Sequence, residues 1–160
     1  MFQHPPKIYG VTLRQIAGML APDGAALGDL AAALRLEPFL DRDLNVDLSG
    51  GETKRAELLQ VLLQRHRVLL LDEPESGVDV ENISLMGSLL DRYMRESGCA
   101  TLVITHTGHM LDYIRADRGC VMVGGAVHCA GEPRALLREV RKHGYEKCRE
   151  CECGTPNAKT

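Results

Sequence analysis

Apolar positions along the chain predict helices that alternate with short strands. Helical spacing of apolar residues predicts helices over residues 12–20, 27–36, 50–66, 80–96, 109–114 and 133–143. An unbroken aliphatic run at 68–71 predicts a strand that is buried on both faces, and residues 100–105 predict a second buried strand. Two further runs, 120–123 and 126–130, flank Gly124-Gly125 and predict a hairpin. This short helix–strand rhythm predicts an α/β fold with a parallel sheet and right-handed crossovers.

The run at 68–71 ends in two adjacent carboxylates, Asp72 and Glu73. Pro74 cannot continue a central strand, so we expect the strand to stop there. Open α/β sheets bind ligands at the carboxyl ends of their strands. One carboxylate then suits a metal ion and the next suits an attacking water. A strand that simply ends in a charged loop is the alternative.

The longest run of helical spacing before these acids is expected to begin at Ser49. Ser49 and Glu52 have the spacing of a capping box, in which each side chain bonds a backbone N–H. Gly50 and Gly51 each lower helix propensity by about 1 kcal/mol relative to Ala, and they suit a place where another group approaches the backbone closely. Free N–H groups at a helix start bind anions such as phosphate. An ordinary cap that contains two glycines is the alternative.

Composition narrows the classes of function. The 160 residues suffice for one domain with a real core, and the net charge of -3 does not indicate a nucleic-acid-binding surface. No apolar run approaches the roughly 18 residues of a membrane span, and no signal peptide is recognisable. Six cysteines in a sequence without a recognisable secretory signal indicate a reducing compartment, where thiols or metal ligands are expected rather than disulfides. We therefore expect a cytoplasmic protein that neither binds nucleic acid nor inserts into a membrane.

A cysteine cluster lies near the carboxyl end of the sequence. Cys148, Cys151 and Cys153 fall within six residues and are candidate ligands for zinc or an iron–sulfur cluster. His143 or a thiol from another chain could supply a fourth ligand, and a tail with free thiols is the alternative. Three other cysteines lie in or beside strands and are expected to be small core residues: Cys99, Cys120 and Cys129.

Taken in order, these segments resemble the nucleotide-binding subunit of ABC-type ATPases over about residues 1–145. The matching segments are the signature at 48–52, the Walker B strand at 68–72, the D-loop at 76–79, the Q-loop residue Gln3 and the switch residue His106. The resemblance implies a P-loop NTPase-like parallel sheet with a helical insert. It divides the chain into a Q-loop and helical subdomain (1–47), the carboxyl-terminal part of the ATPase core (48–145) and a cysteine-containing tail (146–160).

The resemblance also implies a site for ATP and magnesium, shared by two ATPase domains that face each other head to tail in a homodimer. The signature residues would bind the γ-phosphate of ATP held by the partner; they are Ser49, Gly50, Gly51 and Glu52. Asp72 would hold Mg²⁺ through water, and Glu73 would orient and polarise the attacking water.

Three further roles are implied by the resemblance alone. His106 would contact the γ-phosphate and sense its loss. Gln3 would join the magnesium and water network, and Asp79 would link the two sites across the dimer.

Within this superfamily, several stretches resemble the ATPase of the SUF iron–sulfur cluster assembly system. They are residues 2–8, 49–57, 105–106, 111–114 and 143–145. This implies ATP hydrolysis that drives cluster assembly, with the scaffold proteins of that system as partners. The ATP-binding subunit of an ABC transporter is the alternative. In transporter ATPases, however, the signature more often continues with Gln and Arg-Val after its second glycine. A third interpretation is a non-catalytic module that dimerises through the signature face or binds metal through the tail.

The family's P-loop, G-x-x-x-x-G-K-[ST], is missing from the sequence. None of the five lysines follows a glycine, so no loop is predicted to hold the β-phosphate. We therefore expect the carboxyl-terminal part of an ABC ATPase, with weak ATP binding and no hydrolysis by this chain alone. The first strands of the sheet would also be missing, which would leave an apolar edge uncovered. Two interpretations are compatible with the missing P-loop: a fragment of an active ATPase, and a degenerate or regulatory form of one.

Overall fold

The computed structural model describes residues 1–21, 25–145 and 148, and the chain divides into two compact units. The first unit is Met1–Ile114, and the second starts at Arg115. No helix in the described ranges is long and apolar enough to cross a membrane.

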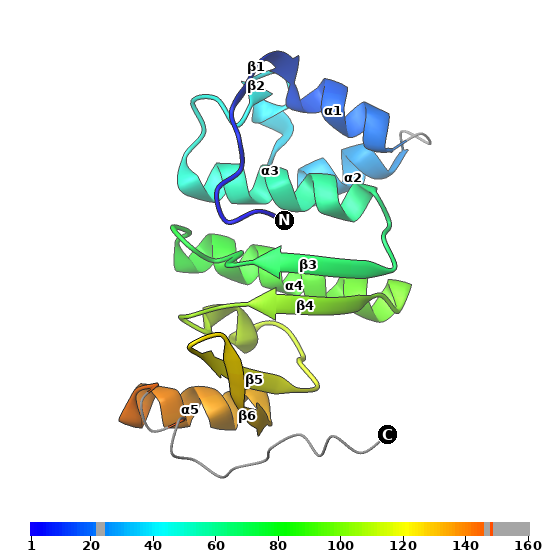
Figure 1. The fold of residues 1–160 in the computed structure, drawn as a ribbon. Helices are drawn as coiled ribbons and strands as arrows, with labels where there is room; N and C mark the ends of the chain where they lie inside the picture. The colour runs from blue at the N-terminus through cyan, green and yellow to red at the C-terminus, as the bar shows by residue number, and fades with distance from the viewer. Residues whose placement is uncertain (22–24, 146–147, 149–160) are drawn as a thin grey trace. The chain divides into compact units, whose positions relative to one another are not determined.

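The first unit begins with a helical layer (Figure 1). Its elements are β1 (Ile8–Thr12), α1 (Leu13–Leu20), α2 (Ala25–Ala33), the 3-10 turn η1 (Glu37–Phe39), β2 (Asp43–Leu44) and α3 (Gly50–Leu63). All three helices follow the predicted spacing, with ends shifted by a few residues. The antiparallel pair β1–β2 was not predicted, because β2 has only two residues and β1 is largely exposed. Both strands are therefore too short or too polar to produce a pattern.

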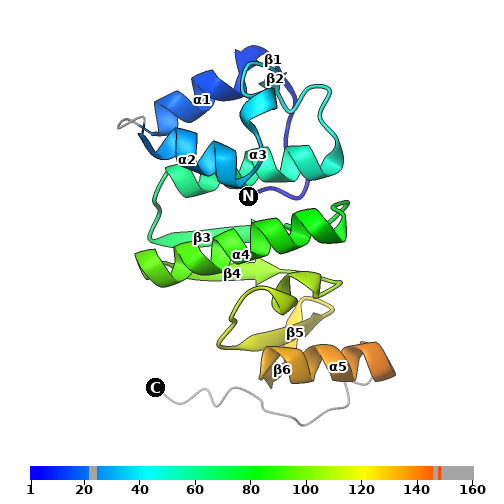
Figure 2. The same ribbon diagram turned by 180° about the vertical axis from the view of Figure 1, so that it is seen from behind.

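The remainder of the first unit is a pair of parallel strands with a helix on one side. Its elements are β3 (Val68–Asp72), α4 (Val80–Ser97), β4 (Ala100–Ile104) and the 3-10 turn η2 (His109–Asp112). The two strands pair in parallel from Val68 opposite Ala100 to Asp72 opposite Ile104. Helix α4 lies behind the strands in Figure 1 and in front of them in Figure 2. The predicted parallel pairing through a helical connection is confirmed.

One face of this strand pair is buried and the other is open. Leu69 and Leu71 are each 1% exposed, whereas Val68 and Leu70 are 58% and 61% exposed. The open face continues on β4 with the exposed side chains of Leu102 and Ile104. The prediction that β3 is buried on both faces and that β4 is a buried strand is therefore wrong, because helices in the described part of the chain cover only one face of the pair. Alternate side chains consequently point to solvent.

Both long helices begin at polar caps. Glu52 N–H donates to Ser49 Oγ at 3.3 Å and Ser49 N–H donates to Glu52 Oε2 at 2.7 Å, so the predicted capping box of α3 is confirmed. Helix α4 is capped by Asp79, which accepts the N–H of Asn82 at 3.0 Å. It ends at Gly98 with φ of 65°, a left-handed conformation that glycine adopts without strain.

The second unit is a hairpin with one helix packed against it. Its elements are β5 (Gly119–Val123), β6 (Ala126–Gly131) and α5 (Pro133–His143). Gly124 and Gly125 both have positive φ, as a two-residue type I′ turn requires, so the predicted hairpin is confirmed. Cys129 is buried as expected and Cys99 is half-buried. The expectation for Cys120 is wrong, because that residue occupies an outward position of β5 and is exposed.

We expect Gly87→Ala to destabilise the first unit by about 1–3 kcal/mol. A Cβ at Gly87 would lie 2.5 Å from Tyr113 Cβ and 3.0 Å from Met110 Sδ, so α4 and η2 would have to separate. Gly18→Ala on α1 is the matched control, because nothing lies within 4 Å of its added Cβ. That control should stabilise the fold by up to about 1 kcal/mol through helix propensity. Urea unfolding measures both, and equal effects of the two substitutions would contradict the predicted close contact.

Candidate active site

Three residues that are distant in the sequence meet at the carboxyl end of β3. Gln3 Nε2 donates to Glu73 Oε2 at 2.8 Å, and His106 Nδ1 lies 3.0 Å from Glu73 Oε1. The Glu73 side chain is 19% exposed and that of His106 is 59% exposed, so the cluster opens to solvent on the histidine side. Both oxygens of the Glu73 carboxylate are thus held by polar partners.

The Glu73 carboxylate is kept ionised at neutral pH. Partial burial raises its pKa, but the hydrogen bonds to Gln3 and His106 outweigh that effect and leave the pKa below its ordinary value. An ionised carboxylate accepts hydrogen bonds, so Glu73 can orient a water molecule on its solvent-facing side.

Lys54 holds the backbone beneath this cluster. Its ammonium donates to the carbonyl oxygens of Phe2, Gln3 and Glu73 at 3.1, 2.9 and 3.1 Å. Glu73 itself has φ of 44°, in the left-handed region that costs an ordinary residue about 1–2 kcal/mol. Its N–H donates to Ile104 O at 2.9 Å. The lysine and the strand β4 therefore fix a backbone turn that Glu73 would not adopt unaided.

The position of Lys54 explains why the sequence did not reveal its role. The residue lies on α3 and is only 4% exposed, although a lysine in an amphipathic helix normally indicates the solvent face. Burial lowers the pKa of Lys54, while the nearby carboxylates of Glu57, Asp72 and Glu73 raise it. The ammonium therefore offsets negative charge at the strand end, and no periodicity or motif spacing indicates this.

Asp72 occupies the last position of β3. Its N–H donates to Met1 O at 3.2 Å, and its side chain is half-buried. The described residues contain no group of three or more His, Cys, Asp or Glu side chains that could hold a metal. A magnesium ion in a nucleotide site takes one or two carboxylates and completes its shell with waters and phosphate oxygens. Asp72 therefore fits one protein ligand of such an ion, directly or through water.

Glu75 is a second buried acid that the sequence analysis did not single out. It is 4% exposed and accepts hydrogen bonds from the hydroxyls of Thr105 and Thr107, the latter at 2.9 Å. These threonines flank His106 in the sequence. Glu75 therefore ties the loop after β3 to the segment that presents the histidine. A threonine on each side of a candidate histidine is the only sequence signal that points to this contact.

The signature residues form a second group at the start of α3. A Cβ on Gly50 would lie 2.8 Å from Gly77 O, and one on Gly51 would lie 3.2 Å from Asn82 Nδ2. The expected close approach to these glycines is therefore present, and the approaching atoms belong to the 76–79 loop and to α4. Asp79 accepts hydrogen bonds from the backbone and side chain of Asn82, which lower the pKa of Asp79.

Only part of the cysteine cluster lies in the described region. Cys148 is buried, and its carbonyl oxygen lies 3.8 Å from Cys129 Sγ. Burial raises the pKa of the Cys148 thiol, which disfavours the thiolate form that metals bind. Cys151 and Cys153 lie outside the described residues. His143, the candidate fourth ligand, lies on α5, where its Nε2 is 3.8 Å from Glu139 Oε2.

We expect Lys54→Met to destabilise the first unit by about 3 kcal/mol, because three backbone carbonyls would lose their donor. Lys7→Met is the control, since Lys7 is exposed. Guanidinium unfolding measures the difference. A loss for Lys54→Met no larger than that for Lys7→Met would refute the role assigned to the ammonium.

A pH dependence follows from the capping box. The hydrogen bond from Ser49 N–H lowers the pKa of Glu52 below its ordinary 4.5, so the folded state prefers the carboxylate. The resulting stability is present above that pH and is lost as the pH falls through the lowered pKa. Glu52→Gln keeps a capping acceptor but does not titrate. Unfolding free energies are measured between about pH 3 and pH 7, a window that brackets the ordinary pKa of a carboxyl group. They should fall less steeply with acid in Glu52→Gln than in the unsubstituted chain.

The family comparison and the sequence relatives described below all match proteins of the ABC transporter type. A sequence model described as ABC transporter matches residues 1–76. The chain is 34% identical over 110 residues to the probable ATP-dependent transporter ycf16 of Cyanidium caldarium, covering 69% of this chain and 42% of that protein. It is 34% identical over 128 residues to an uncharacterised ABC transporter ATP-binding protein of Methanocaldococcus jannaschii, MJ0035, covering 79% and 48%.

The fold agrees with these sequence matches. MJ0796, a bacterial ABC transporter cassette solved as a dimer, superposes with a TM-score of 0.70 at 22% identity, covering 82% of this chain and 60% of that one. The chain spans less than half the length of the two sequence relatives described above. The sequence comparisons and the fold together show that residues 1–76 match the ABC transporter family and that the chain has the fold of ABC ATPase cassettes.

Proposed function

We propose that this chain supplies the water-activating part of an ABC-type ATPase site. The observation that carries the proposal is the Glu73 carboxylate, which stands at the end of a parallel strand with Gln3 and His106 on its two oxygens. A carboxylate that is fixed at both oxygens is restricted in position, and phosphoryl transfer depends mainly on positioning and charge neutralisation.

Each residue then has a role in hydrolysis. Glu73 orients and polarises the attacking water. His106 reaches toward the γ-phosphate, and its imidazole is the most exposed group of the cluster. Gln3 reports on the state of Glu73 through its hydrogen bond, and its backbone is tied to Glu73 through Lys54.

Asp72 would hold Mg²⁺ through water, and the ion would neutralise charge on the phosphates when it is bound. Asp72 suits this role by its position at the strand end beside Glu73. Lys54, which lies behind both carboxylates, limits their mutual repulsion.

The signature residues would act on a second ATPase domain in a head-to-tail homodimer. Ser49, Gly50, Gly51 and Glu52 begin α3, and free N–H groups at a helix start suit the γ-phosphate of ATP held by the partner. Asp79 would connect the two sites, since its loop touches the signature through Gly77. The dimeric form of the MJ0796 cassette supports this assembly.

We further propose that the chain divides into three parts after residues 47 and 145 and that it is located in the cytoplasm. A separate proposal is that it acts in iron–sulfur cluster assembly, with the scaffold proteins of the SUF system as partners. The support for that role is the resemblance of residues 49–57 and the other stretches named above. The names of the relatives favour the alternative, an ATP-binding subunit of a transporter. Titration of the chain with SUF scaffold proteins discriminates between the two: micromolar binding supports assembly, and its absence favours transport.

A chimaera tests the ATPase role. Residues 1–145 of this chain would replace the matching part of the Methanocaldococcus jannaschii relative, which contributes the remainder of the domain. We expect ATP turnover by the chimaera and a loss of about 100-fold or more in Glu73→Gln, because a water-orienting group is removed. Glu139→Gln, an exposed acid on α5, is the matched control and should leave turnover unchanged.

The chain by itself provides the converse test. We expect no ATP turnover by the purified 160-residue chain, since none of its lysines follows a glycine. Turnover by the chain alone that disappears in Glu73→Gln would contradict this part of the proposal. A chimaera whose turnover is insensitive to Glu73→Gln would contradict the role of the carboxylate.

A further inference from the structure

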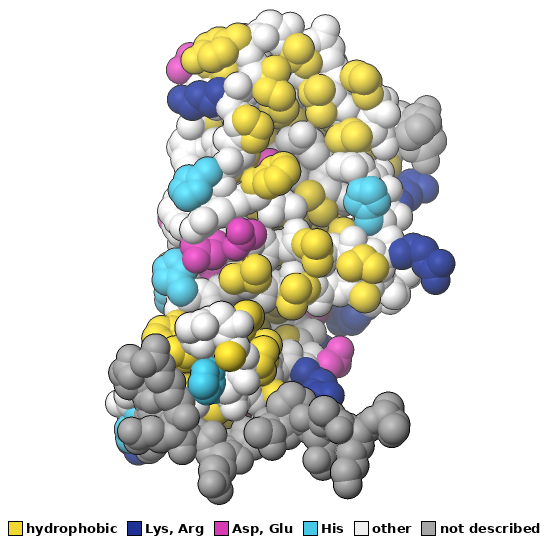
Figure 3. Space-filling model, in the orientation of Figure 1, with side chains coloured by type: hydrophobic (Ala, Val, Ile, Leu, Met, Phe, Trp, Pro, Cys, Tyr) yellow, Lys and Arg dark blue, Asp and Glu magenta, His cyan; other side chains and the backbone are white. Residues whose placement is uncertain are grey.

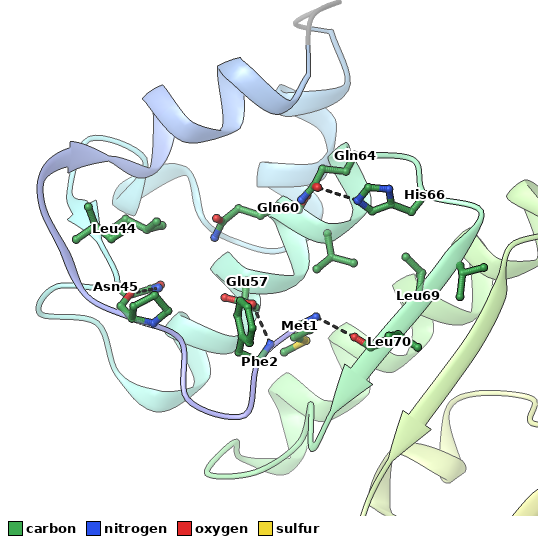
Figure 4. A pocket seen from close by; sticks show the side chains of 14 residues that line it. Met1, Phe2, Leu44, Asn45, Glu57, Gln60, Gln64, His66, Leu69 and Leu70 are labelled. Atoms are coloured by element: carbon green, nitrogen blue, oxygen red, sulfur yellow. Dashed lines mark hydrogen bonds between the residues drawn. The ribbon is translucent and has the colours of Figure 1, made fainter.

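The two partners of the Glu73 carboxylate are held in different ways. Gln3 lies in the amino-terminal segment, where Phe2 N–H donates to Glu57 Oε1 at 3.0 Å (Figure 4). His106, by contrast, has a side chain that is 59% exposed, and Figure 3 shows histidine and acidic side chains next to one another at the surface. Packing therefore does little to orient the imidazole, and its direction depends on the backbone of the loop that carries it.

That loop, Thr105 to Gly108, connects β4 to η2 and closes on one oxygen of Glu75. The hydroxyls of Thr105 and Thr107 both donate to Glu75 Oε1, the second at 2.9 Å. Thr105 Oγ1 in turn accepts the N–H of Gly108 at 2.8 Å, and Thr107 Oγ1 accepts that of His109 at 3.4 Å. Each hydroxyl has one proton and gives it to the carboxylate. Two chains of hydrogen bonds therefore run from backbone N–H through a hydroxyl to the same oxygen, and bonds in such chains strengthen one another.

The Glu75 carboxylate is a fixed acceptor. The residue is 4% exposed, and its Oε2 is buried without a hydrogen-bond partner among the residues that the structure describes. A buried carboxylate requires opposite charge nearby. The Lys54 ammonium supplies it: burial lowers the pKa of Lys54, and Glu75 is one of the carboxylates that raise it. The hydroxyl donors of the loop thus converge on a single oxygen atom whose own position is fixed by burial.

Three consecutive residues of the loop contact two acids. The two threonines contact Glu75, whereas His106 between them contacts Glu73, with its Nδ1 at 3.0 Å from Glu73 Oε1. The two acids are separated only by Pro74, which is fully buried and has a φ fixed by its ring. A shift of the loop relative to Glu75 would therefore carry the imidazole away from Glu73.

We propose that Glu75 is a positioning residue of the candidate site. Through the hydroxyls of Thr105 and Thr107, its carboxylate fixes the direction in which His106 presents its imidazole to Glu73. The consequence for hydrolysis rests on the proposed function, in which the histidine reaches toward the γ-phosphate. The positioning itself rests on hydrogen bonds within this chain, so it is tested without nucleotide.

The experiment uses NMR of the intact chain with isotope-labelled histidine rings. The Nδ1 resonance of His106 is identified by its disappearance in His106→Gln, and Glu73→Gln gives its position when the ionised partner is lost. We expect Glu75→Met, which has a similar length and no carboxylate, and Thr107→Val each to move this resonance most of the way to the Glu73→Gln position. Glu75→Met should also speed hydrogen exchange at the Gly108 amide at least about tenfold, because the loop loses its anchor.

Two matched variants separate positioning from a general loss of structure. Thr107→Ser keeps the hydroxyl and should retain the His106 resonance of the unsubstituted chain. Thr101→Val removes a hydroxyl of β4 that contacts Cys99 instead, and it should leave that resonance unchanged. If Glu75 acts through Thr107, the double variant should move the resonance no further than the larger of the two single changes. Circular dichroism establishes that each variant is folded, and Thr107→Val carries the test if Glu75→Met is not.

An unchanged His106 resonance in the folded Glu75→Met and Thr107→Val variants would overturn the proposal, as would an equal change in Thr101→Val. Fully additive changes in the double variant would also overturn it, since the acid and the hydroxyl would then act separately. In the chimaera described above, Glu75→Met should lower kcat for ATP at least about tenfold and change KM much less, because a displaced histidine impairs the reaction more than binding. A displaced His106 resonance with full turnover in the chimaera would refute the histidine's role in the proposed function and still support its positioning by Glu75.

Discussion

The candidate site depends on a single buried ammonium group. Lys54 donates to three backbone carbonyls that belong to the amino-terminal segment and to the turn after β3. It holds Glu73 in a left-handed conformation and keeps Gln3 within hydrogen-bond distance of the Glu73 carboxylate. A lysine pays a desolvation cost at such a place, and the surrounding carboxylates compensate for it. Charge balance and backbone geometry at the strand end are therefore set by the same side chain.

Two acids serve different parts of this arrangement. Glu73 is partly buried and contacts Gln3 and His106. Glu75 is almost fully buried and accepts hydrogen bonds from the threonines on either side of His106. The histidine is thus positioned by its own contact with Glu73 and by the anchoring of its neighbours. Because both acids lie in one loop after β3, a displacement of that loop would move the histidine segment and the glutamine segment together.

The sequence predicted most elements and most members of the candidate site. The helices at α3, α4 and α5, the parallel pair β3–β4 and the hairpin at Gly124-Gly125 follow from apolar spacing and from turn chemistry. Gln3, Glu73 and His106 were found through motif order, and they do meet in the structure. Lys54 and Glu75 were missed, because a buried charge is recognised from its partners, and those partners are backbone carbonyls and hydroxyls that lie far away in the sequence.

What the sequence determined by itself is local: where helices begin, where strands stop, and which polar residues follow them. Capping, helix propensity and side-chain periodicity act over a few residues, so a single sequence displays them. The tertiary structure decided which faces are covered. Leu70 and Leu102 belong to aliphatic runs that predict complete burial, yet they are exposed because the helices of this chain pack on the opposite face. The burial of a strand depends on which other elements pack against each of its faces. A run of apolar residues in the sequence does not show which faces are covered.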